Sequence, residues 1–375
     1  MPIYESESLI KLHIVLEIGT AYTRLGFSGE FAPRFIIKSE IRCKTTNKMR
    51  KLSDYKDQND LYDMLVEFIQ LIYFKYALIS PKDKPIVLVE SILCPTLFRS
   101  TLAKVLFSHY EVSAIWYLPS HLVSLAPLEV DTALVLDVGY SEAVAVPICH
   151  GYPVLHAWEA LPIGSQHVQK KIMELLSSDN LGVQNLNEDV LEDIKDRCCF
   201  VTKIDRAENF SSAKPTITPC PEVTYPLGGN KMLKVSGKLR ETAFEVLYNE
   251  DVDGRCLTTM ILDALLKVNV DLRLKLAGNI LLTGGTIMTP GFKARLKAEL
   301  HKQLELPKYK HLKTENFVFK FHNPPCKDNY TAWLGGAIYS CTELFASKAL
   351  TRDQYLKEER VPDWSNMRDN VRSTA

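Results

Sequence analysis

The feature that most constrains the fold of this 375-residue chain is a short pattern that occurs twice. In LHIVLEIGTAYTRLGF, from residue 12, an apolar strand ends at Glu17 and Gly19 follows; in TALVLDVGYSEAVAVPI, 120 residues further along, Asp137 and Gly139 take these places. Apolar strands on both sides of a glycine-containing turn predict a β-hairpin. The separation is too long for a solenoid repeat and favours two duplicated lobes, each built around one hairpin.

Size and charge agree with two lobes. A chain of 42.5 kDa is more than one hydrophobic core usually holds. Its 45 lysines and arginines balance 45 aspartates and glutamates, so nothing favours nucleic acid or an anionic membrane as a partner. We expect no signal peptide and no membrane span, because the N-terminus lacks a basic region and the apolar run at 12–18 is interrupted by His13 and Glu17.

The nine cysteines are scattered and odd in number, and they form no C-x-x-C pair or zinc-ligand cluster. This usage predicts reduced thiols in a cytosolic protein, with no metal site of its own.

The remaining chain alternates helical and strand patterns, which predicts an α/β fold. The expected elements are a helix at 61–79, a strand at 86–90, a helix from about 95, a helix up to 270, a strand within NILLTGGT, a helix at 290–304 and a helix from 330. Residues 177–230 are rich in Ser, Thr, Asn, Gly and Pro, so we expect a loop-rich surface there with one helical patch at 191–201.

Three segments have the composition of a phosphate or nucleoside site. At a hairpin tip, glycine lets backbone N–H groups approach a phosphate, a hydroxyl donates a hydrogen bond, and a carboxylate orients magnesium-bound water. After an apolar strand, paired glycines let a nucleoside lie against the backbone. Each segment alone is usually only a turn, so their order along the chain carries more weight. They are Glu17-Ile18-Gly19-Thr20, Asp137-Val138-Gly139-Tyr140 and Thr283-Gly284-Gly285-Thr286.

In this order the segments resemble actin and the actin-related proteins. LEIGTAYTRLGFSGEFAPRF is similar to the first phosphate hairpin of the family, VLDVGYSEAVAVPICHGYPVLHA to the second, and NILLTGGTIMTPGF to its adenosine motif. ESILCPTLFRSTLAKVLF (90–107) and NYTAWLGGAI (329–338) resemble segments that connect these elements. The resemblance runs from about residue 12 to 355 and implies a two-lobed α/β ATPase fold with a nucleotide cleft between the lobes.

The resemblance also implies domain boundaries. Residues 1–127 and 331–375 would form the first lobe, with 39–60 as a shortened subdomain 2. Residues 128–330 would form the second lobe, with the loop-rich part at 165–252 as subdomain 4.

Carried over position by position, the resemblance implies ATP or ADP with Mg²⁺ as the cofactor. In the first hairpin Glu17, Thr20 and Arg24 stand where actin has Asp, Ser and Lys, so charge or hydroxyl is kept. Lys195 and Asp196 align with a Lys-Glu pair that contacts adenosine, although a solvated helical charge pair is the alternative. The implied cofactor-binding residues are Gly19, Thr20, Arg24, Asp137, Gly139, Lys195, Asp196, Gly284, Gly285 and Thr286.

Two departures argue against catalysis. Tyr140 replaces the second aspartate of the second hairpin, so a phenol stands where a carboxylate binds phosphate-side water. Ser120 stands where the family has the glutamine that positions the attacking water. Phosphoryl transfer depends on such positioning, so we expect hydrolysis to be slow or absent and assign no catalytic residue. His121 is a candidate substitute base, but a structural histidine is the stronger interpretation.

The chain is also short in the segment through which an actin subunit contacts its neighbour. Between Arg34 and the helix at 61, the interval is shorter than in actin, and 43–60 is polar without an apolar tip. On the opposite, barbed face, Tyr152 and the segment 333–355 would provide the two walls of a cleft, unless Tyr152 and Trp333 are core aromatics. We therefore predict a subunit that terminates a filament at its pointed end.

Within the family, the chain looks most like the actin-related subunits at the pointed end of dynactin. This implies a cytoplasmic, cytoskeletal protein that contacts the actin-related filament subunits of dynactin through the barbed-face cleft. Other pointed-end dynactin subunits would be further partners, with 177–230 and 43–60, including Lys48, Arg50 and Lys51, as candidate surfaces. Two alternatives remain: an active actin-like ATPase, and a nuclear actin-related protein of a chromatin remodeller.

Overall fold

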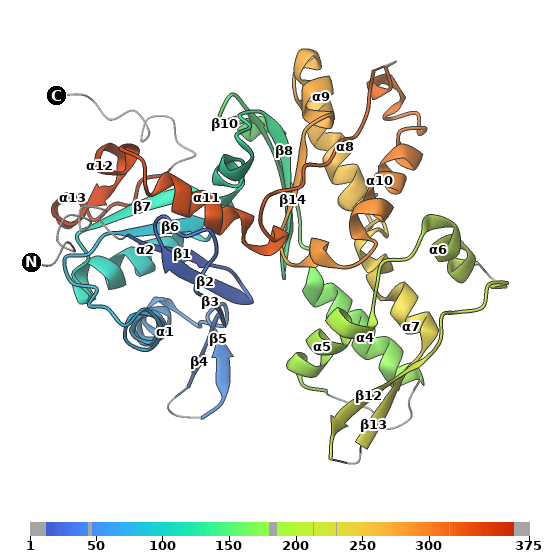
Figure 1. Cartoon of the computed structure of the whole chain (residues 1–375), viewed down its shortest axis with the longest axis horizontal. Coiled ribbons are helices and arrows are strands. Elements are labelled where there is room, and N and C mark those ends of the chain that lie inside the picture. Colours follow the sequence, from blue (N-terminus) through green and yellow to red (C-terminus); the bar gives the residue numbers. More distant parts are fainter. Residues whose placement is uncertain are drawn as a thin grey trace, which may run out of the picture. The chain divides into compact units, whose positions relative to one another are not determined.

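The computed structural model describes residues 13–43, 47–179, 186–212, 214–229, 231–314 and 316–363. Its contacts divide the chain into two compact units, which are described in turn (Figure 1). The first unit comprises Met1–Asp131 and Pro324–Ala375, and the second comprises Thr132–Asn323.

A six-stranded sheet forms the centre of the first unit, in the order β15-β7-β6-β1-β2-β3. β1 and β2 form the predicted hairpin, with Glu17 opposite Arg24. β1 then runs parallel to β6, which runs parallel to β7. The strands are β1 (Ile14–Ile18), β2 (Tyr22–Phe27), β3 (Phe35–Lys38), β6 (Ile86–Glu90), β7 (Ala114–Pro119) and β15 (Leu350–Thr351).

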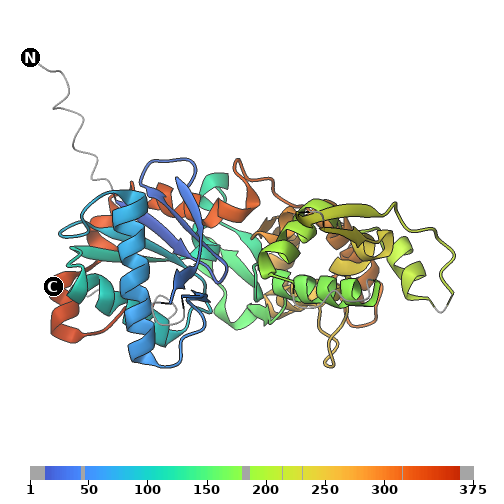
Figure 2. The ribbon, with the colours of Figure 1, turned by 90° about the horizontal axis from the view of Figure 1, so that it is seen from below.

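Two hydrophobic cores lie on the two faces of this sheet, because neighbouring residues of a strand point to opposite sides. Ile14 and Leu16 pack in the core that includes α1 and α2, whereas Val15 packs in the core that includes α11. Figure 2 shows α1 crossing one face of the sheet. The helices are α1 (Gln58–Leu71), continued by the π-helical η1 (Ile72–Ala77), α2 (Thr96–Lys104), η2 (Val105–His109), α3 (Ser120–Val123), η3 (Ala126–Leu128), η8 (Asp328–Tyr330), α11 (Thr331–Tyr339), α12 (Leu344–Lys348) and α13 (Arg352–Glu358).

The contact between α3 and α11 depends on a glycine. A Cβ on Gly335 would lie 1.8 Å from the Val123 carbonyl oxygen, so no other residue fits without separating the helices. Two positions earlier, Trp333 is fully buried and its indole Nε1 donates to the Val15 carbonyl at 3.0 Å. α11 is therefore packed tightly on both the sheet and α3.

The segment between β3 and α1 forms a small two-stranded sheet of β4 (Glu40–Arg42) and β5 (Met49–Lys51). Arg50 of β5 forms an ion pair with Asp60 in the first turn of α1, at 2.5 Å. α1 itself begins where the Asp57 carboxylate accepts from the N–H groups of Asn59 and Asp60. The paired strands β4 and β5 are thus fastened to the helix that follows them.

The sheet of the second unit repeats the arrangement of the first. β8 (Ala133–Val138) and β9 (Ala143–Cys149) form an antiparallel hairpin, and β14 (Ile280–Thr283) runs parallel to β8. β10 (Tyr152–Pro153) and β11 (Glu159–Leu161) both pair with β9. Even the turns agree: the Gly139 N–H donates to the Glu142 carbonyl at 2.9 Å, as the Gly19 N–H donates to Tyr22 at 3.0 Å. The predicted duplicated hairpins and the α/β class are confirmed.

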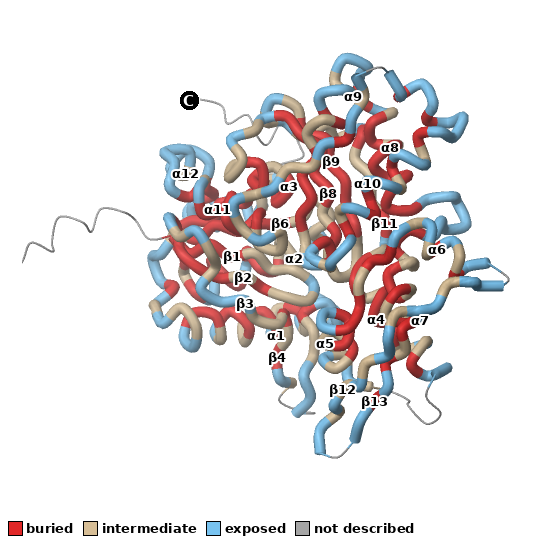
Figure 3. The backbone as a smooth tube through the Cα atoms, turned by 45° about the vertical axis from the view of Figure 1, so that its right-hand side comes forward, coloured by how far each residue is buried: buried red, intermediate tan, exposed pale blue. Residues whose placement is uncertain are grey.

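Helices and a second hairpin complete this unit. Figure 3 shows β8 and β9 as largely buried, whereas much of β12 and β13 is exposed. The elements are α4 (Ser165–Asp179), α5 (Glu188–Cys198), α6 (Ile204–Ser211), β12 (Val223–Gly228), β13 (Lys231–Val235), α7 (Gly237–Thr242), α8 (Leu257–Lys267), α9 (Val270–Ala277) and α10 (Phe292–Gln303), with 3₁₀ turns η4 (Leu155–Ala157), η5 (Ala243–Leu247), η6 (Thr286–Met288) and η7 (Lys310–Leu312).

The prediction of a loop-rich 177–230 with one helical patch is wrong in part. Besides α5, the segment contains the end of α4, α6 and strand β12. In β12 half-buried and exposed residues alternate, as expected for a strand with one covered face. Pro226 and Gly228 hide that pattern in the sequence, and the pairing with β13 accommodates them through a shift of register.

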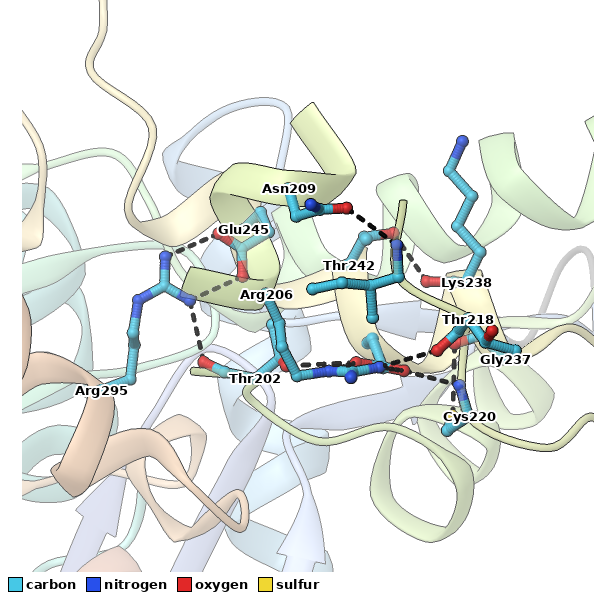
Figure 4. Close-up of polar contacts among 12 residues, drawn as sticks. Thr202, Arg206, Asn209, Thr218, Cys220, Gly237, Lys238, Thr242, Glu245 and Arg295 are labelled. Carbon is cyan, nitrogen blue, oxygen red and sulfur yellow. Dashed lines mark hydrogen bonds and ion pairs between the residues drawn. The ribbon is translucent and has the colours of Figure 1, made fainter. Parts of the chain in front are cut away.

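Buried ion pairs join α6 to α7 and α10 to η5 (Figure 4). The Arg295 guanidinium, 5% exposed, donates to both carboxylate oxygens of Glu245 at 2.9 and 2.8 Å and to the Thr202 carbonyl at 2.9 Å. Glu241, 1% exposed, accepts from Arg206 at 2.7 Å. Burial acts to raise the pKa of Glu241, but hydrogen bonds led by that from Arg206 hold it below its ordinary value. This part of the unit therefore depends on paired charges as well as on apolar packing.

All nine cysteines are free thiols. Within the described ranges, no helix is both long enough and apolar enough to cross a bilayer.

Candidate functional site

In the first unit, the predicted phosphate hairpin carries its own ion pair. Arg24 Nη1 donates to Glu17 Oε1 at 2.6 Å, and both side chains are mostly buried. Gly19 is required in the turn, because a Cβ there would lie 2.8 Å from the Tyr22 carbonyl oxygen. Thr20 is exposed at the tip. The Gly19 N–H donates within the turn and its carbonyl accepts from Ser39 Oγ at 2.6 Å, while the charge of Arg24 is balanced by Glu17.

In the second unit, the structure brings the second hairpin and the paired glycines together. β14 is parallel to β8 and places Thr283 opposite Asp137, so the carboxyl ends of both strands meet at one edge of the sheet. A Cβ on Gly284 would lie 2.6 Å from Asp137 Oδ1, and the Thr286 hydroxyl donates to the Gly139 carbonyl at 2.8 Å. We call Asp137, Gly139, Gly284 and Thr286 the turn cluster.

The start of α4 completes the support of this turn. The Ser165 N–H donates to the Gly139 carbonyl at 3.2 Å and the Gln166 N–H donates to the Tyr140 carbonyl at 2.9 Å. These are amides of the first helical turn, which have no partner inside a helix. The positive end of the α4 dipole therefore lies at the hairpin turn, an arrangement that favours an anion nearby.

Tyr140 has a partner that the sequence does not reveal. Its hydroxyl donates to the Glu188 carboxylate, on the first residue of α5 and 48 positions further along the chain. Sequence reasoning identified the loss of a carboxylate at this position but missed Glu188, because no local pattern links the two residues.

Lys195 and Asp196 lie further along α5. Lys195 is 7% exposed and its Nζ lies 3.1 Å from Asp196 Oδ1. The Asp196 side chain is 59% exposed, so the alternative of a solvated helical charge pair fits Asp196 but not the buried Lys195. In the described part of the chain, however, no hydrogen bond joins the pair to the turn cluster, so the adenosine contact stays a prediction.

Ser120 and His121 form the first turn of α3 in the first unit. Both are buried, and Ser120 Oγ lies 3.3 Å from His121 Nδ1. α3 packs against α11, so this pair belongs to a tightly packed helix contact. The geometry favours the structural interpretation of His121 over a general base.

The turn cluster fits a nucleotide. A Cβ added to Gly285 would have no atom within 4 Å, and one on Gly139 would meet only the Glu142 carbonyl oxygen, at 3.4 Å. Open backbone beside a carboxylate and a helix N-terminus suits a nucleoside phosphate. Thr286 is 3% exposed and serves to hold Gly139 in place. Across the described residues, no three potential metal-ligating side chains gather, so a magnesium ion here would depend on phosphate and water ligands.

One expectation about the barbed face is wrong. Trp333 is fully buried and hydrogen-bonded to Val15, so it contributes to the core of the first unit and offers no surface to a partner. Tyr152 of the second unit is 70% exposed, and in the segment that follows Trp333 the exposed apolar residues are Ile338 and Leu344.

A family profile described as Actin matches residues 59–187 and 184–364, so the chain belongs to the actin family. It is similar to Actin-related protein 10 of Dictyostelium discoideum, with 29% identity over 95% of this chain and 90% of that protein. It is also similar to Actin-like protein 9 of Homo sapiens, at 25% identity over 93% of the chain and 86% of the relative, and to an Actin-like protein of Neurospora crassa, at 25% over 93% and 97%. The resemblance expected from the motifs is confirmed.

Proposed function

We propose that this chain is a non-catalytic actin-related subunit that caps the pointed end of the actin-related filament of dynactin. There it would support the pointed-end complex in dynein-driven transport along microtubules. The observation that carries this proposal is the segment between β3 and α1, reduced to a hairpin of two three-residue strands. A segment this short has little to offer a next subunit, so growth would stop at this chain. The similarity to Actin-related protein 10 supports the same proposal.

The absence of catalysis is part of the proposal. Ser120 is buried in the α3 contact, and the Tyr140 hydroxyl is bonded to Glu188. Neither residue replaces the positioning that phosphoryl transfer needs. A single-turnover assay with radiolabelled ATP tests this: we expect no phosphate release above that of buffer, and stoichiometric release would favour the active ATPase instead.

ATP or ADP with Mg²⁺ would serve as a structural ligand. In the first unit taken by itself, the proposed ligand residues are Gly19, Thr20 and Arg24. In the second unit taken by itself, they are the turn cluster with Gly285, Lys195 and Asp196. A ligand that binds only the folded state stabilises it by mass action. Acid extraction of the purified native complex, followed by chromatography, should release adenine nucleotide. If no adenine nucleotide is released, this part of the proposal is contradicted.

The proposed partners are the actin-related filament subunits of dynactin, through Tyr152 and the segment 333–355 without Trp333. Other pointed-end subunits would bind 43–60 or 177–230, and the protein would be cytoplasmic and cytoskeletal. In 43–60, Arg50 is already paired with Asp60, so its charge supports the hairpin. Any docking test there must use other positions, because reversal at Arg50 would disrupt the fold.

The first test is affinity purification of the tagged chain from cytosol, with mass spectrometry of what accompanies it. Recovery of dynactin subunits is expected, whereas chromatin-remodelling subunits would support the nuclear alternative. Tyr152→Ala should lose filament subunits, while Met232→Ala, a matched control at another exposed apolar residue, should retain them. Equal recovery with both variants would exclude the Tyr152 surface.

A further inference from the structure

α5 is held at two points by tyrosine hydroxyls. At its first residue, Glu188 accepts a hydrogen bond from Tyr140 of the second hairpin turn. Further along, Asp193 Oδ2 accepts from Tyr225 of β12 at 2.7 Å. Leu191 and Ile194 of the same helix are buried in the core of the unit. Apolar packing thus holds one face of α5, and the two tyrosines tie it to the hairpin turn and to the β12–β13 hairpin.

The residue type at position 140 decides whether this tie exists. A carboxylate at that position would face Glu188, so like charges would repel the turn from the helix. A phenol reverses the sign of the interaction, because its O–H donates to the carboxylate. The loss of the aspartate and the presence of Glu188 are therefore two parts of one arrangement.

Hydrogen bonds from within the protein hold the turn. The carbonyl groups of Gly139 and Tyr140 accept hydrogen bonds from α4, and Gly139 also accepts from Thr286. With Tyr140 bonded to α5, three separate elements hold a turn of four residues. A phosphate bound there would add its contacts to these hydrogen bonds.

We propose that Tyr140 is a positioning residue that locks the second hairpin turn to α5, so that the turn, α5 and the attached β12–β13 hairpin keep one arrangement with or without nucleotide. This rests on the proposed function and deepens it: a cap that does not cycle presents the same surface in every nucleotide state. The lock replaces ligand-dependent order with a hydrogen bond inside the protein.

Hydrogen-exchange mass spectrometry of the full chain, with and without ADP–Mg²⁺, tests the lock. In the unaltered chain, protection of 137–142 and 188–198 should change less than about twofold on adding nucleotide. Tyr140→Phe should lower protection of both segments by roughly tenfold, the effect of losing a hydrogen bond to a charged group. Tyr140→Asp should lower it further, because it adds repulsion from Glu188.

Tyr225→Phe is the matched control, since it removes from β12 an equivalent hydroxyl that hydrogen-bonds to the same helix. It should loosen 223–228 and leave 137–142 protected. In the double variant Y140F/E188A, the loss should be close to that of either single change, because both remove one bond. Three results would overturn the lock. They are additive losses of protection in the double variant, an unchanged exchange rate in Tyr140→Phe, and a strong effect of nucleotide on protection in the unaltered chain. Failure to recover dynactin subunits would overturn the proposed function while leaving these exchange results intact.

Discussion

Replacing Arg295 by methionine should strongly destabilise the second unit. Methionine keeps the length and apolar character of the side chain but removes every donor. Glu245 loses two hydrogen bonds, Glu299 loses one at 2.8 Å, and the Thr202 carbonyl loses one at 2.9 Å. The Arg295 side chain is only 4% exposed, so water replaces few of these lost hydrogen bonds. Removing one partner of a buried pair costs about 3–5 kcal/mol, and with four bonds lost we expect about 4 kcal/mol.

The loss of stability in Arg295→Met should depend on pH and should be smaller at low pH. Burial raises the pKa of Glu245 above its ordinary value, and hydrogen bonding to Arg295 only partly offsets this. Without Arg295 the folded-state pKa of Glu245 rises further. A raised folded pKa gives stability that is present below the unfolded pKa and is lost as the pH rises through the folded pKa. Arg295→Met should therefore be less destabilised at pH 5 than at pH 7.5, by about 1 kcal/mol.

Urea unfolding of the full chain at both pH values, followed by hydrogen exchange in α10 peptides, measures the effect. Arg255→Met is the control, because Arg255 pairs with Asp251 and Asp253 at the surface and should cost under about 1 kcal/mol. Adding Glu245→Gln to Arg295→Met should recover part of the loss. A cost below about 1 kcal/mol, or the same cost at both pH values, would refute the assignment of a buried, charge-dependent pair.

Three further predictions concern Gly335 of the first unit and Gly285 and Thr286 of the second. Gly335→Ala should destabilise the first unit by about 3 kcal/mol or more in thermal unfolding, because overlap with the Val123 carbonyl outweighs a helix-propensity gain of about 1 kcal/mol; a stabilised variant would contradict the packing. Gly285→Ala, with no atom near the added carbon, should change stability by less than about 0.5 kcal/mol, and a larger loss would show that the site is more crowded. Thr286→Val should cost about 1 kcal/mol and speed amide exchange at Gly139, and unchanged exchange would mean that its hydroxyl does not hold the turn.

Much of the fold was predictable because its signals are local. The strand at 86–90 follows from four consecutive apolar residues before Glu90, and the structure has β6 at Ile86–Glu90. Both hairpins follow from apolar strands on each side of a glycine turn, and their registers place Glu17 opposite Arg24 and Asp137 opposite Val144. The order of motifs along the chain was enough to identify the actin family.

Other expectations failed where a residue's partner is distant in sequence. Trp333 is an aromatic in a glycine-containing helix, and no local pattern distinguishes a partner-binding wall from a core residue. The structure decides this through a hydrogen bond to Val15, 318 positions away. The β12–β13 hairpin was missed for a related reason, since its pairing compensates for Pro226 and Gly228 only once both strands are in place.

The sequence by itself determined which local units this protein contains: two phosphate-type hairpins, a glycine pair after a strand, and a shortened segment before α1. Alternation of apolar and polar residues, turn residues and the length of a segment are local properties, so they can be read from the order of residues. Only the tertiary structure decided which side chains are available to bind a ligand or a partner. Trp333 is buried in the core, Arg24 forms an ion pair with Glu17, and Tyr140 donates a hydrogen bond to Glu188. Burial and hydrogen-bond partners arise when distant segments pack together, and for that reason no local pattern specifies them.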